Sequence, residues 1–135
     1  MLTHLKSLGS LTKVLGNIYH LLKSDSQFIG VYPNAVSKPE IAKKYNFRTD
    51  FDPTKHFSGA QYTTRVENSD GSVFEIKEIH LPQAEFRRCA EIAGFIDVQF
   101  ANPIVSEEGT RAKPEEFWKE FRQIPIYQFF VCKKF

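Results

Sequence analysis

The sequence predicts a mixed α/β fold: a partial sheet whose last strand runs antiparallel, helices that flank this sheet, and an inserted β-hairpin. Near the start of the chain, an amphipathic segment leads through a short polar turn into an apolar strand. The last third alternates helix, strand, helix and strand. Between these regions, two runs rich in β-branched and aromatic residues flank the turn-forming stretch from Asn68 to Gly71.

The composition is that of one globular domain. With 135 residues, of which 41% are apolar and 25% charged, the chain can bury a core and is not expected to be disordered. The formal net charge of +2 comes from interspersed acids and bases, which argues against nucleic-acid binding. Because Lys6, Lys13 and Lys23 interrupt the apolar N-terminal stretch, we expect no signal peptide, no membrane span and a cytoplasmic location.

The N-terminal quarter is predicted to be a helix followed by a strand. Leucine and isoleucine recur at spacings of three and four between Ser7 and Lys23, as on the apolar face of a helix. A turn then leads to an apolar strand over Gln27–Tyr32, which Pro33 ends. A strand of this kind is typically buried on both faces of a parallel sheet, so we expect half of a βαβ unit without its leading strand.

A short helix and a less regular stretch follow. Ser37 and Glu40 have the spacing of a capping box, which predicts a helix that runs to about Tyr45. The polar and aromatic residues 46–60 carry few structural signals and are interpreted as a loop or lid.

An antiparallel hairpin is expected next. Residues 61–67 and 72–81 have the β-branched and aromatic character of strands, and the turn between them ends in Gly71. The whole stretch 46–81 is therefore predicted to be an insert, with a lid and a hairpin.

Prolines and one glycine delimit the last third. Pro82 is expected to open a helix that Gly94 ends, because glycine adopts the left-handed terminal conformation at low cost. Residues 96–100 should form a strand, and Pro114 and Pro125 should bound another helix. The inner side of the first helix is predicted to carry Phe86, Cys89, Ala90 and Ile92.

The final strand, residues 126–134, should fold back antiparallel beside the strand that contains Phe28. Its Cys132 and the helical Cys89 lie in no Cys-x-x-Cys or Cys/His spacing. We therefore expect two free, buried thiols and no metal site.

Several motifs together resemble the C-terminal half of a class I S-adenosylmethionine-dependent methyltransferase. They are an amphipathic helix ending in Leu-Leu-Lys, the Phe-Ile-Gly strand, a helix ending in Ala-Gly-Phe, and an antiparallel last strand. Within that superfamily, the pattern Val-Ser-Glu-Glu-Gly at 105–109, with Phe117-Trp118 and Pro125 after it, is similar to the toxoflavin synthase group. The chain has Ser24-Asp25-Ser26 where family members usually have Pro-Gly-Gly after the Leu-Lys.

The resemblance implies a Rossmann-like methyltransferase sheet of which 1–135 is the C-terminal part, and transfer of a methyl group from S-adenosylmethionine to a small molecule. Such enzymes bind the cofactor through a Gly-rich turn after their first strand and an acidic residue after their second. Neither feature is found in this sequence, so no cofactor-binding residue is assigned and the chain alone is expected to be inactive.

Candidate site residues lie on the substrate side. Tyr32 and Asn34 follow the carboxyl end of a predicted parallel strand, where open α/β sheets bind ligands. His56 in the lid has the chemistry of a general base, and Tyr62 lies beside it. Trp118 has a face on which a planar substrate could stack. For each, an ordinary structural role is the alternative: strand-end packing, an exposed loop histidine, or a core anchor.

The strand at 27–32 should lack a neighbour on one side, and an open edge invites a partner. The chain is thus expected to pair with a missing N-terminal half or to form a homodimer through that edge, whether it is a fragment, one piece of a split enzyme or a truncated product. Two other hypotheses stay open: a non-catalytic remnant that binds a partner through the edge, and an independent α+β ligand-binding module.

Overall fold

The computed structural model describes residues 5, 7–34, 39–55 and 57–135. Its helices are α1 (Leu8–Leu21), α2 (Pro39–Lys44), α3 (Gln83–Ile92), α4 (Glu107–Ala112) and α5 (Glu115–Gln123). Its strands are β1 (Gln27–Pro33), β2 (Phe47–Thr49), β3 (Gln61–Glu67), β4 (Val73–Ile79), β5 (Ile96–Ala101) and β6 (Tyr127–Lys133). None of the described helices combines the length and the apolar character needed to cross a membrane.

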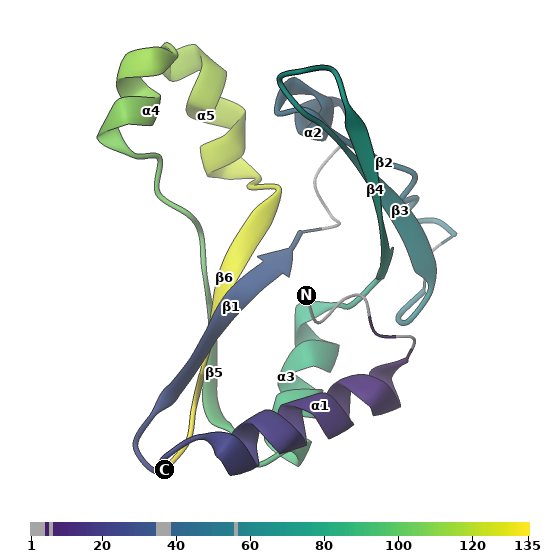
Figure 1. Ribbon diagram of the computed structural model, residues 1–135, viewed down its shortest axis with the longest axis vertical. Coiled ribbons are helices and arrows are strands. Elements are labelled where there is room, and N and C mark those ends of the chain that lie inside the picture. Colours follow the sequence, from purple (N-terminus) through teal and green to yellow (C-terminus); the bar gives the residue numbers. More distant parts are fainter. Residues whose placement is uncertain (1–4, 6, 35–38, 56) are drawn as a thin grey trace.

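The strands form two separate antiparallel sheets (Figure 1). In the first sheet, which we call sheet A, β6 lies in the middle between β1 and β5 and runs antiparallel to both. Phe28 is opposite Cys132 and Gly30 is opposite Phe130, so the predicted pairing of the final strand with the Phe28 strand is confirmed. The mixed α/β fold class is confirmed with it.

Helices α1 and α3 cover one face of sheet A (Figure 1). Leu11 and Leu15 of α1 are fully buried, as the leucine spacing predicted. They share a hydrophobic core with Phe86 of α3 and with Phe130 of β6. The Ser7 hydroxyl accepts a hydrogen bond from the backbone N–H of Ser10 at 3.2 Å, which caps the N-terminus of α1.

The opposite face of sheet A is apolar and exposed. Ile29 and Val31 of β1 are 59% and 47% exposed, and Phe129 of β6 is 38% exposed. The prediction that β1 is buried on both faces is therefore wrong for the described chain, and both of the pairings in its sheet are antiparallel. The physical reason is that α1 and α3 both pack on one side, whereas on the other side strands β2–β4 approach β1 near Val31 and Pro33 and leave Ile29 and Phe129 exposed.

The boundaries of α3 and α5 follow the prolines and glycine as predicted. Gly94 has a φ of +105° directly after α3, and an added Cβ would lie 3.0 Å from the Tyr19 ring of α1. One prediction for α3 is wrong: Ile92 is 65% exposed rather than on the inner side, because the helix ends there and turns its last residue to solvent.

The second sheet, sheet B, has the order β2-β3-β4. The predicted hairpin is present as β3 and β4, with Gln61 opposite Ile79 and Glu67 opposite Val73. The stretch 46–60 is not entirely a loop, because Phe47 and Thr49 pair with Val66 and Thr64 to add β2. Three paired residues are too few to leave a signal in the sequence.

Helix α4 was not predicted. The Ser106 hydroxyl accepts a hydrogen bond from the backbone N–H of Gly109 at 3.1 Å, and Glu107 and Glu108 occupy the first turn. Both acids therefore lie on an exposed helix.

Both cysteines are free and buried, as predicted: Cys89 is 5% exposed and Cys132 is fully buried. Burial raises the pKa of the Cys132 thiol to about 12, because an apolar environment disfavours the thiolate.

We therefore expect Cys132 to resist iodoacetamide at pH 8 in the folded protein and to react once guanidinium unfolds the chain. The folded state holds this proton more tightly than the unfolded state, so the free energy of unfolding should fall as pH rises from 9 towards 12. Mass spectrometry of the labelled peptide measures the reaction. Rapid labelling of Cys132 in the folded protein would contradict the burial.

Candidate functional site

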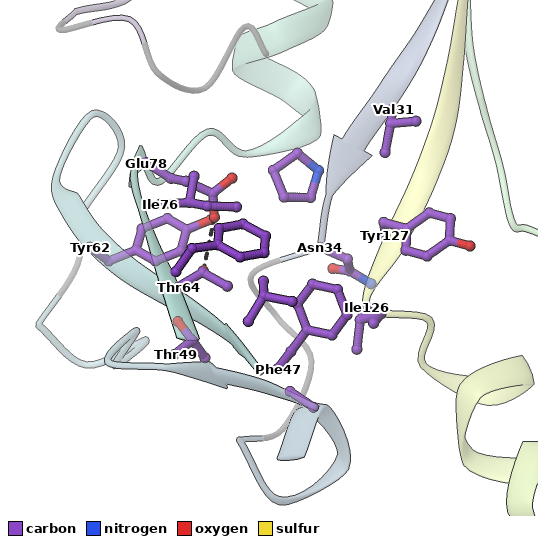
Figure 2. A pocket seen from close by; sticks show the side chains of 14 residues that line it. Val31, Asn34, Phe47, Thr49, Tyr62, Thr64, Ile76, Glu78, Ile126 and Tyr127 are labelled. Atoms are coloured by element: carbon purple, nitrogen blue, oxygen red, sulfur yellow. Dashed lines mark hydrogen bonds between the residues drawn. The ribbon is translucent and has the colours of Figure 1, made fainter. Parts of the chain in front are cut away.

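A cavity of about 320 Å³ lies where sheet A and sheet B face each other (Figure 2). Its size is at the lower end of the range for small-molecule sites. One wall is formed by the end of β1 and the start of β6, and the other wall by one face of sheet B. Ala42 of α2 also contributes to the lining.

The sheet A wall is built from the carboxyl end of β1 and the amino end of β6. Val31, Pro33, Ile126 and Tyr127 supply mostly apolar surface there. Asn34 holds the two segments together, because its backbone N–H donates to the Ile126 carbonyl at 3.0 Å and its Nδ2 donates to the Pro125 carbonyl at 2.8 Å. The Asn34 side chain therefore helps to hold this wall of the cavity in place.

The sheet B wall follows from the two-residue period of its strands. Alternate residues of an antiparallel strand point to opposite faces. On β4 the cavity face carries Phe74, Ile76 and Glu78, whereas Glu75 and Lys77 are exposed to solvent. The same register brings the remaining sheet B residues of the lining together: Phe47, Thr49, Tyr62, Thr64 and Val66.

Glu78 is the one charged residue among the described residues that line the cavity. Its side chain is only 4% exposed and accepts a hydrogen bond from Thr64 Oγ1 at 2.9 Å, drawn as a dashed line in Figure 2. Tyr62, directly opposite on β3, also hydrogen-bonds to Glu78. Burial, and then the charge of Glu78, raise the pKa of the Tyr62 hydroxyl far above its usual range, so Tyr62 stays a neutral donor.

Two of the predicted site residues, Asn34 and Tyr62, line this cavity from opposite walls. Tyr32 is placed elsewhere: it is 6% exposed and belongs to the core of sheet A, with its ring 5.9 Å from that of Phe86 and 5.1 Å from that of Phe100. Burial raises the pKa of the Tyr32 hydroxyl well above its usual range.

Trp118 does not line the cavity. Its indole N–H donates to the Gly109 carbonyl at 3.0 Å, which ties α5 to α4, and its ring stacks on Tyr45 at a centroid distance of 6.0 Å. The predicted general base, His56, lies outside the described residues.

Sequence reasoning missed Glu78, the most chemically distinctive residue of the cavity. The signal was present in β4, where the alternation places one acid on the same face as Phe74 and Ile76. A carboxylate on the apolar face of a predicted strand is unusual enough to mark a site.

The described residues provide neither a metal centre nor a dinucleotide-type cofactor turn. No group of three or more His, Cys, Asp or Glu side chains among them could hold an ion. Gly30, the glycine within β1, faces the Phe130 ring rather than open space, so its backbone is not available to approach a cofactor.

The fold resembles part of a solved methyltransferase structure. The CcbJ methyltransferase from Streptomyces caelestis resembles the chain with a TM-score of 0.57 at 14% sequence identity, over 99% of this chain. The matched region is 57% of the length of the CcbJ chain, so this chain spans little more than half of that structure. Neither a protein-family model nor a curated protein sequence matches the chain.

Proposed function

We propose that this chain is the substrate-side, C-terminal half of an S-adenosylmethionine-dependent methyltransferase that acts on a small molecule in the cytoplasm. The observation that carries the proposal is the cavity at the carboxyl end of β1, within a chain whose methyltransferase-like fold extends over 99% of its length. The Val-Ser-Glu-Glu-Gly and Phe-Trp patterns support a member of the toxoflavin synthase-like group.

Methyl transfer from a sulfonium is an in-line displacement, so the protein mainly has to position the acceptor and exclude water. The cavity suits this task because mostly apolar walls enclose a few polar groups. In this proposal Asn34 and Tyr62 orient the acceptor from opposite walls and His56 is the candidate base. Tyr32 and Trp118 support the site through packing against neighbouring aromatic rings.

The cofactor site would be completed by another polypeptide segment packed on sheet A. Two features support this arrangement. β1 is an edge strand of sheet A, with β6 as its one described neighbour, so its outer row of backbone groups can pair with a further strand. The exposed side chains of Ile29 and Phe129 offer apolar surface for helices from that segment.

The same surface favours a second candidate function, a non-catalytic remnant that binds a partner through the edge of β1. An exposed apolar face beside an unpaired edge is the composition of a protein interface. The two candidates differ in one property: the first requires the partner segment to bring S-adenosylmethionine, and the second does not.

Titration calorimetry with S-adenosylmethionine separates them. We expect no binding to the 135-residue chain alone, because the described residues lack a Gly-rich turn after a strand. We expect micromolar binding to a polypeptide extended through the reading frame upstream of Met1, if that frame encodes strand, Gly-x-Gly-x-Gly and helix. Binding of S-adenosylmethionine to the chain alone would contradict the proposal that the cofactor site lies on another polypeptide segment. An extended or complemented protein that binds no cofactor would favour the remnant.

A further inference from the structure

Contacts between the end of α2 and helix α5 link the two walls of the cavity. Helix α2 packs against β2 of sheet B, and its Ala42 lines the cavity. Helix α5 is closely followed in the chain by Ile126 and Tyr127, which belong to the sheet A wall. Tyr45, the residue directly after α2, contacts α5. The position of Tyr45 on α5 therefore bears on how far apart the walls lie.

The Tyr45 hydroxyl makes two hydrogen bonds to the backbone of α5. It donates to the Phe117 carbonyl at 2.6 Å and accepts from the Phe121 N–H at 3.1 Å. These two backbone groups are four residues apart, so they are the acceptor and the donor of one position in the α-helical ladder. The hydroxyl uses both its donor and its acceptor capacity there, and this specifies one point on α5.

The Tyr45 ring packs among the aromatic side chains of α5. Its centroid is 5.2 Å from that of Phe117 and 5.4 Å from that of Phe121, and it stacks on Trp118. Phe121 is 6% exposed, and its ring centroid is 5.8 Å from that of Tyr127 in the cavity wall. A continuous series of ring contacts thus joins Tyr45 to the sheet A wall.

The backbone next to Tyr45 is coupled to sheet B. Phe47 begins β2, and the Asn46 carbonyl accepts a hydrogen bond from the Glu67 N–H of β3 at 3.1 Å. Tyr45 therefore connects sheet B on one side with α5 and the sheet A wall on the other.

An ion pair beside Tyr45 contributes less to this contact. Lys44 Nζ lies 2.9 Å from Glu120 Oε2, but the two side chains are 32% and 47% exposed. Water and salt screen such a pair, and two long side chains lose conformational freedom on forming it. The directional contacts of Tyr45 are therefore expected to dominate.

We propose that Tyr45 is a positioning residue that sets the separation of the two cavity walls, because its hydroxyl and ring hold sheet B in place on α5. Without the hydroxyl, sheet B can move away from β1 and β6 and widen the cavity. Helix α5 itself should stay intact, since the Phe121 N–H can then donate to the Phe117 carbonyl alone. The inference concerns the shape of the cavity and does not rest on the proposed methyl transfer.

Double electron–electron resonance between spin labels on the two sheets tests this role. The labels are attached at Ala101→Cys on β5 and Val73→Cys on β4, both exposed positions. Cys89 and Cys132 are buried, so the introduced thiols are the ones that react. We expect a single narrow distance distribution with Tyr45 present. Tyr45→Phe should add a population at longer distances, and Tyr45→Ala should enlarge that population.

Two further measurements separate positioning from a general loss of structure. The far-UV circular dichroism of Tyr45→Phe should remain that of the unaltered chain, because α5 keeps its helical hydrogen bonds. In Tyr45→Ala, the emission of Trp118, the one tryptophan of the sequence, should shift to longer wavelength as its ring loses a stacking partner.

Lys44→Gln is the matched control at the neighbouring residue. It removes the ion pair with Glu120 and keeps Tyr45, so the distance distribution should not change. A distribution that Tyr45→Phe leaves unaltered would overturn the inference, even if Tyr45→Ala failed to fold. An equal effect of Lys44→Gln, or a loss of helical signal in Tyr45→Phe, would overturn it as well.

Discussion

Phe86→Ala is expected to lower the free energy of unfolding by about 3–5 kcal/mol, the largest effect of any single substitution proposed for this chain. Phe86 is 1% exposed and lies between α3 and sheet A. Its ring centroid is 4.7 Å from that of Phe130 and 5.7 Å from that of Phe100. Removal of the ring would leave a cavity between α3 and sheet A, which are held together by the packing of side chains such as Phe86 and Phe130.

The matched control is Ile92→Ala, at the end of the same helix. Ile92 is 65% exposed, so its truncation should change the free energy of unfolding by no more than about 0.5 kcal/mol. Urea denaturation followed by circular dichroism measures both variants. Equal effects at the two positions would show that α3 does not pack on sheet A as described.

Gly30→Ala should destabilise the chain by about 1–3 kcal/mol, although it adds only one methyl group. A Cβ at this position would lie 2.6 Å from Cε1 of Phe130, directly across the β1–β6 ladder. Phe130 is 2% exposed, so its ring cannot move away without disturbing the core. The glycine is therefore required by the close approach of an aromatic ring, not by its backbone conformation.

Gly16→Ala provides a control of opposite sign. Gly16 lies inside α1 and an added Cβ would contact nothing within 4 Å, so alanine should stabilise the chain by about 0.5–1 kcal/mol through helix propensity. The double variant of Gly30→Ala with Phe130→Leu should lose less stability than the sum of its single variants, because the smaller side chain relieves the overlap. If the two losses of stability were additive, the destabilisation by Gly30→Ala would not come from overlap with the Phe130 ring.

Both large effects also concern the site. β1 and β6 run from the core of sheet A to the cavity wall, where Pro33 and Tyr127 are paired. Gly30→Ala and Phe86→Ala should therefore weaken ligand binding in the cavity and also lower the free energy of unfolding. Variants at exposed positions such as Ile92 should affect neither.

Much of the fold could be read from the sequence because the signals are local. The leucine spacing of α1, the turn from Asn68 to Gly71 and the prolines and glycine around α3 and α5 each specify backbone conformation over a few residues. The antiparallel pairing of the final strand was also foreseen, through resemblance to a family of known topology. Of the predicted site residues, Asn34 was chosen at the end of a strand and Tyr62 beside the lid, and both line the cavity; their roles in binding stay predictions.

By itself, then, the sequence determined the helices, the hairpin and most strand boundaries of this protein, because periodicity and turn chemistry act between neighbours in the chain. Only the tertiary structure decided that sheet B faces the ends of β1 and β6, that Trp118 ties two helices together rather than lining the cavity, and that Glu78 is buried there. These outcomes depend on contacts between residues far apart in the sequence. The alternation in β4 puts Glu78 on the same face as Phe74 and Ile76, but it does not specify what covers that face.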